Sequence, residues 1–396
     1  MSMLAQIQAK AAPFVALRHD LHRHPELGLQ EFRTSDRLAE QLQGWGYSVT
    51  RGLATTGLVA QLRRGSGGKR LGLRADMDAL PIHEANTFAH ASVHEGVMHA
   101  CGHDGHTAML MAAAKHIAEE VDFSGTLNLI FQPAEEHPGG AQLMIAQGLF
   151  EQFPCDAVFA AHNMPGIGAG QLVFIEGPAM ASSDDVTITL TGVGGHGAMP
   201  HRAQDPIVAA ASIVMALQTI VSRNVDPQHT AVVTVGSLIA GKANNVIPAS
   251  ARLELSVRAL DREVRDLLQT RITALVTAQA ESLGVQAHID YKRDYPVLVN
   301  TPAETELARQ VGIELLGQAR VTRQGRPLTG SEDFAFMLEH CPGSYFMIGN
   351  GTGEGAGEGQ PAHACMVHNP GYDFNDDILP VGAAFWALLT QRYLKD

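Results

Sequence analysis

The feature of this sequence that most constrains its fold is an alternation of strand-like and helix-like segments that stops near residue 176 and resumes near residue 301. Alternation of this kind predicts an α/β domain with a mostly parallel sheet and helices on both faces. The expected helices are 2–23, 34–45, 106–121, 301–316 and 381–393, and the expected strands are 58–62, 70–75, 126–131, 157–161 and 344–348.

The intervening stretch follows a different order of elements. Its period-2 and period-3.6 patterns predict strand, helix, strand, strand, helix and strand, which is the ferredoxin-like βαββαβ arrangement of one small sheet with two helices on one face. We therefore predict an inserted α+β domain at 180–291 within an α/β domain made of 1–179 and 292–396. The elements expected in the insertion are 186–191, 206–221, 230–238, 251–260, 261–283 and 288–291.

Charge and cysteine content narrow the classes of partner and compartment. Lys and Arg number 28 against 41 Asp and Glu, a formal net charge of −13, which argues against nucleic acid or an anionic membrane as partner. The longest apolar run, 207–217, is shorter than the ~18 residues of a membrane span, and the first residues lack a signal-peptide pattern. The 4 cysteines in so long a chain form no disulfide framework, so we expect a cytoplasmic protein with free thiols.

Polar residues fall at one edge of the expected main sheet. In open α/β sheets, ligands bind outside the carboxyl ends of the strands. Several residues directly follow the expected strands, precede a helix that starts at the same edge, or follow the last strand and its glycine loop. They are Asp76, Cys101, His103, Glu135, Glu136, His162 and His368.

These residue types point to a metal site. Thiolate, imidazole and carboxylate are the ligand set of first-row transition metals. Glu135 and Glu136 would repel each other beside an apolar sheet unless a cation neutralises them or one is protonated. Taken alone, Cys101 would be a small buried hydrophobe, the glutamate pair a solvated face, and most other histidines, His22 among them, surface or satisfied core residues. The combination favours a metal, with one carboxylate as ligand and its neighbour as base.

Other short motifs carry less weight. Residues 192–197 match G-x-G-x-x-G, but Pro200 interrupts the helix that should follow and no acidic residue caps a second strand about 20 positions on. The chain has no G-x-S-x-G elbow, which argues against a serine hydrolase. The glycine-rich run 349–359 lacks a following Lys-Ser/Thr, so we expect a loop and no phosphate site.

Eight motifs together make a family resemblance that covers nearly the whole chain in order. The sequence resembles the aminoacylase and carboxypeptidase metallohydrolases, and within them it is similar to the N-acyl-amino-acid amidohydrolases, the branch of hippurate hydrolases and auxin-conjugate hydrolases. The motifs are LHRHPELG (21–28), RADMDALP (74–81), HACGHDGH (99–106), QPAEE (132–136), GGHGAMPH (194–201), NVIP (245–248), GSEDF (330–334) and HNPGYDF (368–374).

The resemblance implies a metal-dependent amidohydrolase that cleaves N-acyl-L-amino acids into a carboxylic acid and a free amino acid. It implies two divalent ions per subunit, zinc, manganese, cobalt or nickel, with Cys101 bridging them. His103, Glu136, His162 and His368 would complete the ligand shells.

The resemblance also implies roles for residues around the metals. Glu135 would be the general base for a metal-activated water, and His196, reaching the site of the partner subunit, would stabilise the oxyanion. Asn245 and Arg258 would hold the amide and carboxylate end of the substrate, and the Gly330 loop would line the cleft. The inserted domain would act as a lid and make a homodimer or homotetramer.

One departure from the wider family concerns the first metal motif. Where the wider family has a ligating histidine this chain has Arg74, and where it has a bridging aspartate this chain has Cys101. Arginine stays protonated and cannot ligate a metal. His103 would supply the missing imidazole, and Asp76 would orient its neighbours without ligating.

Three alternatives remain open at this stage. A dinuclear carboxypeptidase or dipeptidase on the same fold would differ only beyond the scissile amide. A catalytically silent metal or ligand binder would not need Glu135, and a nicotinamide-dependent oxidoreductase rests on 192–197 alone. The acyl group, whether benzoyl, acetyl, long-chain or auxin-like, is also left open.

Overall fold

The computed structural model describes residues 1–352 and 363–395, and these form two compact units. The first unit consists of Met1–Gly177, Val299–Arg326 and Phe336–Asp396, and the second of Pro178–Leu298 and Pro327–Ala335. The segment near 330, which the sequence placed in the main domain, groups with the insertion because Leu328 exchanges backbone hydrogen bonds with Ala179 (2.9 Å) and Ala181 (3.1 Å).

The first unit is built on an eight-stranded mixed sheet in the order β1-β2-β4-β3-β5-β16-β6-β15. Its centre is parallel, since β4, β3, β5 and β16 pair in parallel, whereas β1, β2 and β4 pair antiparallel and β6 is antiparallel to β16. Its strands are β1 Ser48–Leu53, β2 Gly57–Arg64, β3 Arg70–Asp76, β4 Gly125–Gln132, β5 Ala157–Pro165, β6 Leu172–Val173, β15 Val321–Thr322 and β16 Gly343–Gly351.

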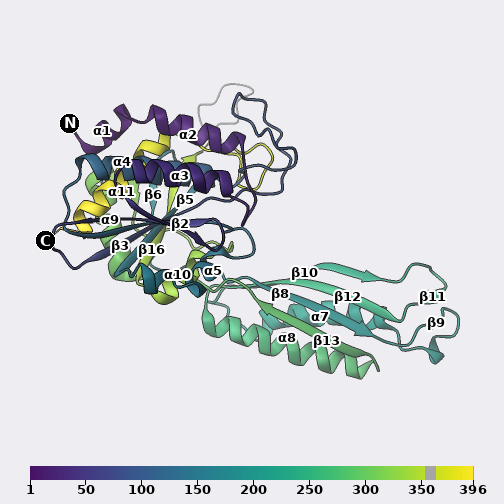
Figure 1. Ribbon diagram of the computed structural model, residues 1–396. Helices are drawn as coiled ribbons and strands as arrows, with labels where there is room; N and C mark the ends of the chain where they lie inside the picture. Colours follow the sequence, from purple (N-terminus) through teal and green to yellow (C-terminus); the bar gives the residue numbers. More distant parts are fainter. Residues whose placement is uncertain (353–362, 396) are drawn as a thin grey trace. The chain divides into compact units, whose positions relative to one another are not determined.

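Helices lie on both sides of this sheet, for example α3 above it and α5 below it in Figure 1. The expected first helix is two helices, because Pro13, which has no N–H to donate, lies in the first turn of the second one. The helices are α1 Met3–Ala9, α2 Ala12–Arg23, α3 Phe32–Gly44, α4 His103–Glu120, α5 Gly140–Ala146, α6 Leu149–Gln152, α9 Pro302–Leu316, α10 Phe334–His340 and α11 Leu379–Tyr393, with 3-10 turns at Gln318–Arg320 and Asp376–Ile378.

Helix α4 is the element that most directly positions the candidate site. It is buried along most of its length because small residues such as Ala108 and Ala112 let it pack closely, and it contacts α2, α11 and β3. Its first residue, His103, therefore lies at the carboxyl edge of the parallel strands. The glycine-rich run expected as a loop begins as the end of β16, and its residues 353–359 lie outside the described residues.

The second unit has a four-stranded antiparallel sheet in the order β10-β12-β8-β13, with two helices packed on it. Along the chain the order is β8, α7, β10, β12, α8, β13, as the sequence predicted (Figure 1). The bounds are β8 Asp184–Thr191, β9 Gly195–His196, a 3-10 turn Pro200–Arg202, α7 Pro206–Arg223, β10 Ala231–Ala240, β11 Val246–Ile247, β12 Ser250–Ala259, α8 Arg262–Ser282 and β13 Gln286–Arg293. The short strands β7 Gly177–Met180 and β14 Leu298–Asn300 pair with each other and span the two chain positions, 177/178 and 298/299, at which the units divide.

Helix α7 is the one described helix that is long and apolar enough to cross a membrane by length and composition, with a mean hydropathy of 1.5. The sequence expectation of no span rested on the shorter apolar run inside it. In the structure, Ala209, Ile213 and Leu217 pack into the core of the second unit. These residues form the buried side of α7, and 33% of its apolar window is buried.

Candidate metal centre

A tight turn between Cys101 and His103 brings two candidate ligands to the start of α4. Gly102 between them has φ +91°, a left-handed conformation that favours glycine. A Cβ there would come within 2.3 Å of Asn163 Nδ2 and 2.4 Å of Tyr372 Oη. The turn therefore requires glycine for two reasons, backbone conformation and close approach.

Cys101, His103 and His162 form one group of candidate ligands, with their ligand atoms within 4.8 Å of one another and all three side chains buried. The Sγ atom of Cys101 lies 3.3 Å from Nε2 of His162. Nδ1 of His162 is 2.6 Å from the carbonyl oxygen of Asn163, to which it donates. This hydrogen bond leaves Nε2 as the nitrogen with a free lone pair, as a metal ligand requires.

His103 is oriented in the same manner by a different partner. Its Nδ1 lies 3.1 Å from a carboxylate oxygen of Asp78. Its buried Nε2 has no hydrogen-bond partner among the described residues, and Asp76 Oδ2 is 3.8 Å away. A buried nitrogen without a partner is rare in proteins, and a cation beside it would satisfy it.

Cys101 also belongs to a second group, with Glu136 and His368. Glu136 follows β4, and its Oε1 lies 3.0 Å from Nε2 of His368. The backbone N–H of His368 donates to the carbonyl of Ala100 (2.7 Å), which fixes this loop residue beside the cysteine. One thiol shared by two groups is the arrangement that a thiolate bridging two ions needs, so the residues present fit a two-metal centre.

The charges around the thiol support the same reading. Burial raises the pKa of Cys101 well above its usual value, and the carboxylates of Glu136 and Glu135 raise it further. Burial opposes protonation of His103, but Asp76 and Asp78 outweigh it and raise its pKa to about 10. Carboxylates therefore surround the protons on Cys101 and His103, and divalent cations would displace these protons on binding.

Glu135 lies where a base would be needed. Its side chain is only 6% exposed, and one of its oxygens is within 4.8 Å of ligand atoms of His103 and Glu136. The preceding Ala134 donates its N–H to Glu31 (2.9 Å), which holds this loop in place. A carboxylate beside two ligands can accept a proton from a substrate water.

Three residues around the ligands were not identified from the sequence. Asp78 binds His103 and also accepts the N–H of Glu136 at 3.0 Å, so it joins the two ligand groups. His106 is the second, and its Nδ1 lies 2.7 Å from a carboxylate oxygen of Asp76, which also pairs with Arg74 (2.6 Å). Only the i, i+3 spacing of His103 and His106 on one helix could have signalled the role of His106.

Asn163 is the third, and it joins several parts of the site. Its Nδ2 donates to the carbonyl of Cys101 (2.7 Å), and its Oδ1 accepts the hydroxyl of Tyr372 (2.6 Å). Its backbone N–H donates to Nε2 of His106 (3.0 Å). A lone asparagine after His162 gives no sequence signal of this role.

The sequence-predicted residues of the inserted unit fall into two places. His196 on β9 and Asn245 beside β11 lie together, since Val246 pairs with His196 and the N–H of Gly197 donates to Asn245 O at 2.8 Å. Both are exposed. Arg258, near the other end of β12, donates to the hydroxyl of Ser331 (2.9 Å), next to the exposed Gly330.

Comparison with known proteins gives a family-wide match. Residues 72–392 match the family described as peptidase family M20/M25/M40. The chain is 42% identical over 395 residues to the hippurate hydrolase of Campylobacter jejuni, covering 100% of both chains. It is 38% identical to the N-acetyl-L-cysteine deacetylase of Bacillus subtilis, covering 85% of this chain and 80% of that protein.

A solved structure supports the same match. The crystal structure of the YXEP protein of Bacillus subtilis, described as a dinuclear metal binding peptidase from the M20 family, has a TM-score of 0.83 and 30% sequence identity. The match covers 98% of this chain and 99% of that one.

Proposed function

Because this chain belongs to peptidase family M20/M25/M40 and is a metallohydrolase of that family, we propose that it hydrolyses the amide bond of N-acyl amino acids, releasing a carboxylic acid and a free amino acid. The observation that carries the proposal is the sharing of Cys101 by two ligand groups, with Glu135 next to both. The names of the two relatives, a hippurate hydrolase and an N-acetylcysteine deacetylase, support an N-acyl amino acid as the substrate class.

We assign two divalent ions to these groups. Cys101, His103 and His162 would hold one, and Cys101, Glu136 and His368 the other. Bound ions would polarise the acyl carbonyl and lower the pKa of water from 15.7 to about 7. The donor set suits zinc, and manganese, cobalt or nickel also accept imidazole and carboxylate ligands.

Glu135 is the proton carrier of the proposed reaction. Its carboxylate accepts a proton from the water that attacks the acyl carbonyl and then passes it to the leaving amine. Its burial keeps bulk water from competing for that proton. Adjacent Glu136 cannot serve this role while it pairs with His368 as a ligand.

Two residues of the inserted unit are proposed to bind the substrate from different subunits. Asn245 lies before the start of β12, and the strand from Ser250 to Arg258 spans about 26 Å if extended. One copy of the unit therefore cannot apply both side chains to one small substrate. We assign Arg258 to the carboxylate, whose planar shape its guanidinium matches, and place Asn245 and the oxyanion donor His196 in the site of the partner subunit.

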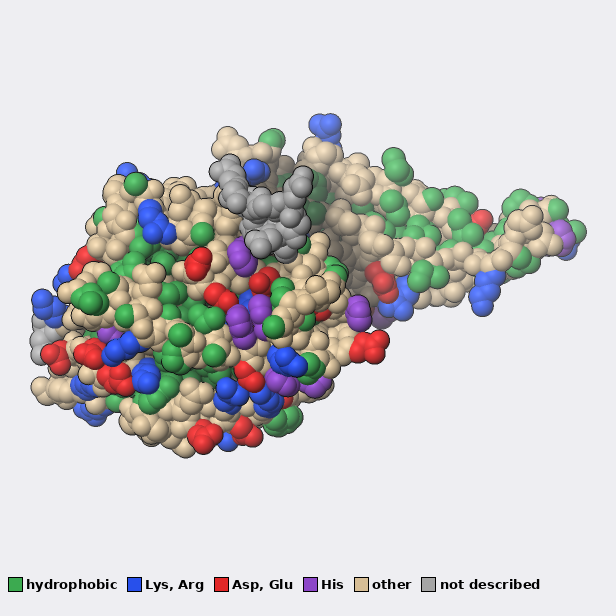
Figure 2. Space-filling model, turned by 90° about the horizontal axis from the view of Figure 1, so that it is seen from above, with side chains coloured by type: hydrophobic (Ala, Val, Ile, Leu, Met, Phe, Trp, Pro, Cys, Tyr) green, Lys and Arg blue, Asp and Glu red, His purple; other side chains and the backbone are tan. Residues whose placement is uncertain are grey.

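The inserted unit has surfaces suited to such a dimer. β10 is an edge strand of its sheet, and hydrophobic side chains (green) are visible on the face of this unit turned toward the viewer in Figure 2. Met215 on α7 is 72% exposed and Ile239 on β10 is 63% exposed. Exposed apolar residues beside an unpaired strand edge are typical of an association surface, and we propose a homodimer or homotetramer through it.

A substrate panel tests the proposed function. Metal-free protein is reconstituted separately with zinc, manganese, cobalt and nickel, and assayed on benzoyl-, acetyl-, long-chain-acyl and indoleacetyl-amino acids and on dipeptides. We expect hydrolysis of one or more N-acyl amino acids to exceed that of the dipeptides. Faster hydrolysis of dipeptides would instead assign the chain to the carboxypeptidase or dipeptidase alternative.

The free state of all four cysteines supports a cytoplasmic location as part of the proposal.

A further inference from the structure

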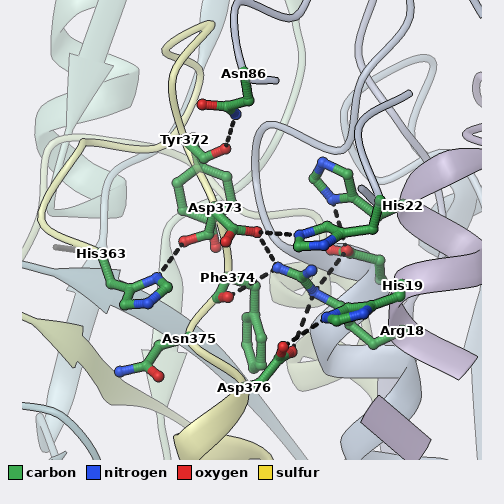
Figure 3. A network of polar contacts seen from close by, with 12 residues as sticks. Arg18, His19, His22, Asn86, His363, Tyr372, Asp373, Phe374, Asn375 and Asp376 are labelled. Atoms are coloured by element: carbon green, nitrogen blue, oxygen red, sulfur yellow. Dashed lines mark hydrogen bonds and ion pairs between the residues drawn. The ribbon is translucent and has the colours of Figure 1, made fainter. Parts of the chain in front are cut away.

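The guanidinium of Arg18 lies fully buried at the centre of a polar network next to the metal centre. Its Nη2 donates to the carbonyl of Phe374 at 2.8 Å and pairs with Asp373, and its Nε lies 3.3 Å from Asp104. Figure 3 shows the side chain projecting from α2 toward the segment that carries Asp373 and Phe374. A buried arginine with no exposed surface and several carboxylate partners forms rigid, charge-assisted contacts.

The partners of Arg18 belong to the two segments that bear ligands on opposite sides of Cys101. Asp104 directly follows His103 in the first turn of α4. Asp373 and Phe374 lie in the segment that follows His368. The guanidinium therefore connects the helix that carries a ligand of the first group to the loop that carries a ligand of the second.

A second set of contacts closes the network around the same loop. His22, also fully buried, contacts Asp104 at 2.9 Å and Glu84 at 3.1 Å. Asn86 donates to Glu84 (3.0 Å) and to the carbonyl of Tyr372 (2.9 Å). The segment at Tyr372 and its successor is thus anchored to α2 and α4 from two sides.

The two ligand-bearing segments depend on this network to different degrees. His103 is buried, is part of a long helix and has Asp78 as a further partner. His368 is a loop residue whose side chain is 51% exposed. Besides its backbone bond to Ala100, its segment is held where Pro370 O accepts the N–H of Ala85 (2.9 Å), and by the contacts of Tyr372, Asp373 and Phe374 described above. The position of the His368 ring therefore depends more on Arg18 than that of the His103 ring does.

We propose that Arg18 is a positioning residue for the second metal ion: it fixes the loop that presents His368 and so sets the affinity of the ion held by Cys101, Glu136 and His368. The inference rests on the proposed two-metal function. Replacing residues that orient metal ligands weakens metal binding by about 10–100-fold. Arg18 contacts neither His103 nor His368 directly and acts through their segments. Because the His368 loop depends on it more than the His103 helix does, its effect should fall on the second ion.

The test is a titration of metal-free protein with Co²⁺ alone, followed by absorption and calorimetry. The wild type should bind two ions. Arg18→Met should bind the first with unchanged affinity and the second about 10–100-fold more weakly. Arg18→Lys keeps the charge but loses the forked set of N–H donors, so its affinity for the second ion should lie between those of the wild type and Arg18→Met.

Arg64, the last residue of β2, provides a matched control because it also contacts α4. It donates to the carbonyl of Ile117 (3.1 Å) and also to those of Ala118 and Val121, at the other end of α4. Arg64→Met should leave binding of both ions unchanged, even if it lowers the melting temperature.

Asp373→Asn provides a second variant in case Arg18→Met misfolds. It leaves the pair of Arg18 with Asp104 in place and should weaken binding of the second ion alone.

The outcomes separate the proposals. Two results would overturn the positioning role. In the first, Arg18→Met binds both ions with wild-type affinity. In the second, Arg18→Met and Asp373→Asn bind both ions equally more weakly while their circular dichroism stays that of the wild type. A wild-type protein that takes up fewer than two ions would overturn the two-metal premise, and the positioning role with it.

Discussion

The Sγ atom of Cys101 and the Nε2 atom of His162 lie 3.3 Å apart although 61 residues separate them in the chain. The first comes from the turn before α4 and the second from β5, which pairs in parallel with β3 and β16. Parallel pairing brings the carboxyl ends of these strands to one edge, and the start of α4 lies at that edge. The contact is therefore a product of sheet topology, and the chemistry of the site depends on it.

Replacing Cys101 by alanine should remove the atom that both ligand groups share. By elemental analysis after dialysis, we expect the wild type to hold two ions per chain and Cys101→Ala to hold less than one. Cys155→Ala is the matched control, because Cys155 is also a free cysteine but contacts Asn128 (3.4 Å) away from the ligands. Equal metal content in both variants would mean that Cys101 is only a buried side chain.

Replacing Glu135 by glutamine should abolish proton transfer while preserving the ligands. General bases contribute about 10²–10⁴-fold to rates, so kcat of Glu135→Gln should fall by that factor or more with metal content unchanged. Glu136→Gln is the informative neighbour, since it should lower metal content as well. Near-normal turnover by Glu135→Gln would contradict its assignment as the base.

The candidate ligands that the structure brings together could be predicted from the sequence because their residue types are rare at strand ends. A cysteine, imidazoles and paired glutamates at one edge of an α/β sheet are informative by chemistry alone. Asp78 and Asn163 were missed because an aspartate two residues past a strand and an asparagine inside one are ordinary by composition. Their roles come from contacts across the fold, which no local pattern contains.

The fold shows the same division between local and long-range information. The order of elements in the insertion is encoded locally, in periodicity. The strand β1 was missed, and the turn that joins it to β2 has Ala54 (φ 48°) and Thr55 (φ 71°) in the left-handed region. Glycine or asparagine would have signalled such a turn. Assignment of the segment around Leu328 to the second unit depends on long-range backbone pairing, which the sequence does not display.

Gly102 allows a test of the packing around the turn at Cys101. Gly102→Ala adds a Cβ within 2.4 Å of Tyr372 Oη, besides the cost of φ +91°. Gly46→Ala is a control for the backbone term alone, because Gly46 has φ +88° and nothing within 4 Å of its Cβ position. Gly46→Ala should cost about 1 kcal/mol of stability, whereas Gly102→Ala should cost more and also lower metal content. Equal effects of the two substitutions would show that the turn tolerates a side chain.

Glu31 predicts a dependence of stability on pH. Its side chain is fully buried beneath the loop that carries Glu135, accepting from Thr56 (2.5 Å) and from Ala134 N–H (2.9 Å). Burial raises the pKa of Glu31 to about 7, from 4.5. The folded state therefore prefers the neutral acid, so this contribution to stability is fully present below pH 4.5 and is lost as the pH rises through 7.

Glu31→Gln, which stays neutral, measures that contribution. A shift of this size corresponds to at most about 3 kcal/mol. We expect Glu31→Gln to have a higher melting temperature than the wild type at pH 8, with the difference shrinking toward pH 5. The exposed Glu281, changed to glutamine, serves as the control and should show no such trend. A difference independent of pH would place the effect in packing and not in ionisation.

His196 tests whether two subunits build one site. His196→Ala alone should lose most activity and keep its metals, since removing an oxyanion donor costs about 10²–10³-fold in rate. If His196 acts in the partner's site, mixing His196→Ala with Glu135→Gln under exchange conditions creates heterodimers in which one site has both native residues. Random pairing in a twofold dimer then restores about one quarter of wild-type activity. A chain carrying both substitutions, mixed with Glu135→Gln, provides no native Glu135 and should restore none. Mass spectrometry should demonstrate that the subunits exchange. If the first mixture stays inactive although they do, His196 acts within its own chain or not at all. The separation of Asn245 from Arg258 along β12 would then need another explanation.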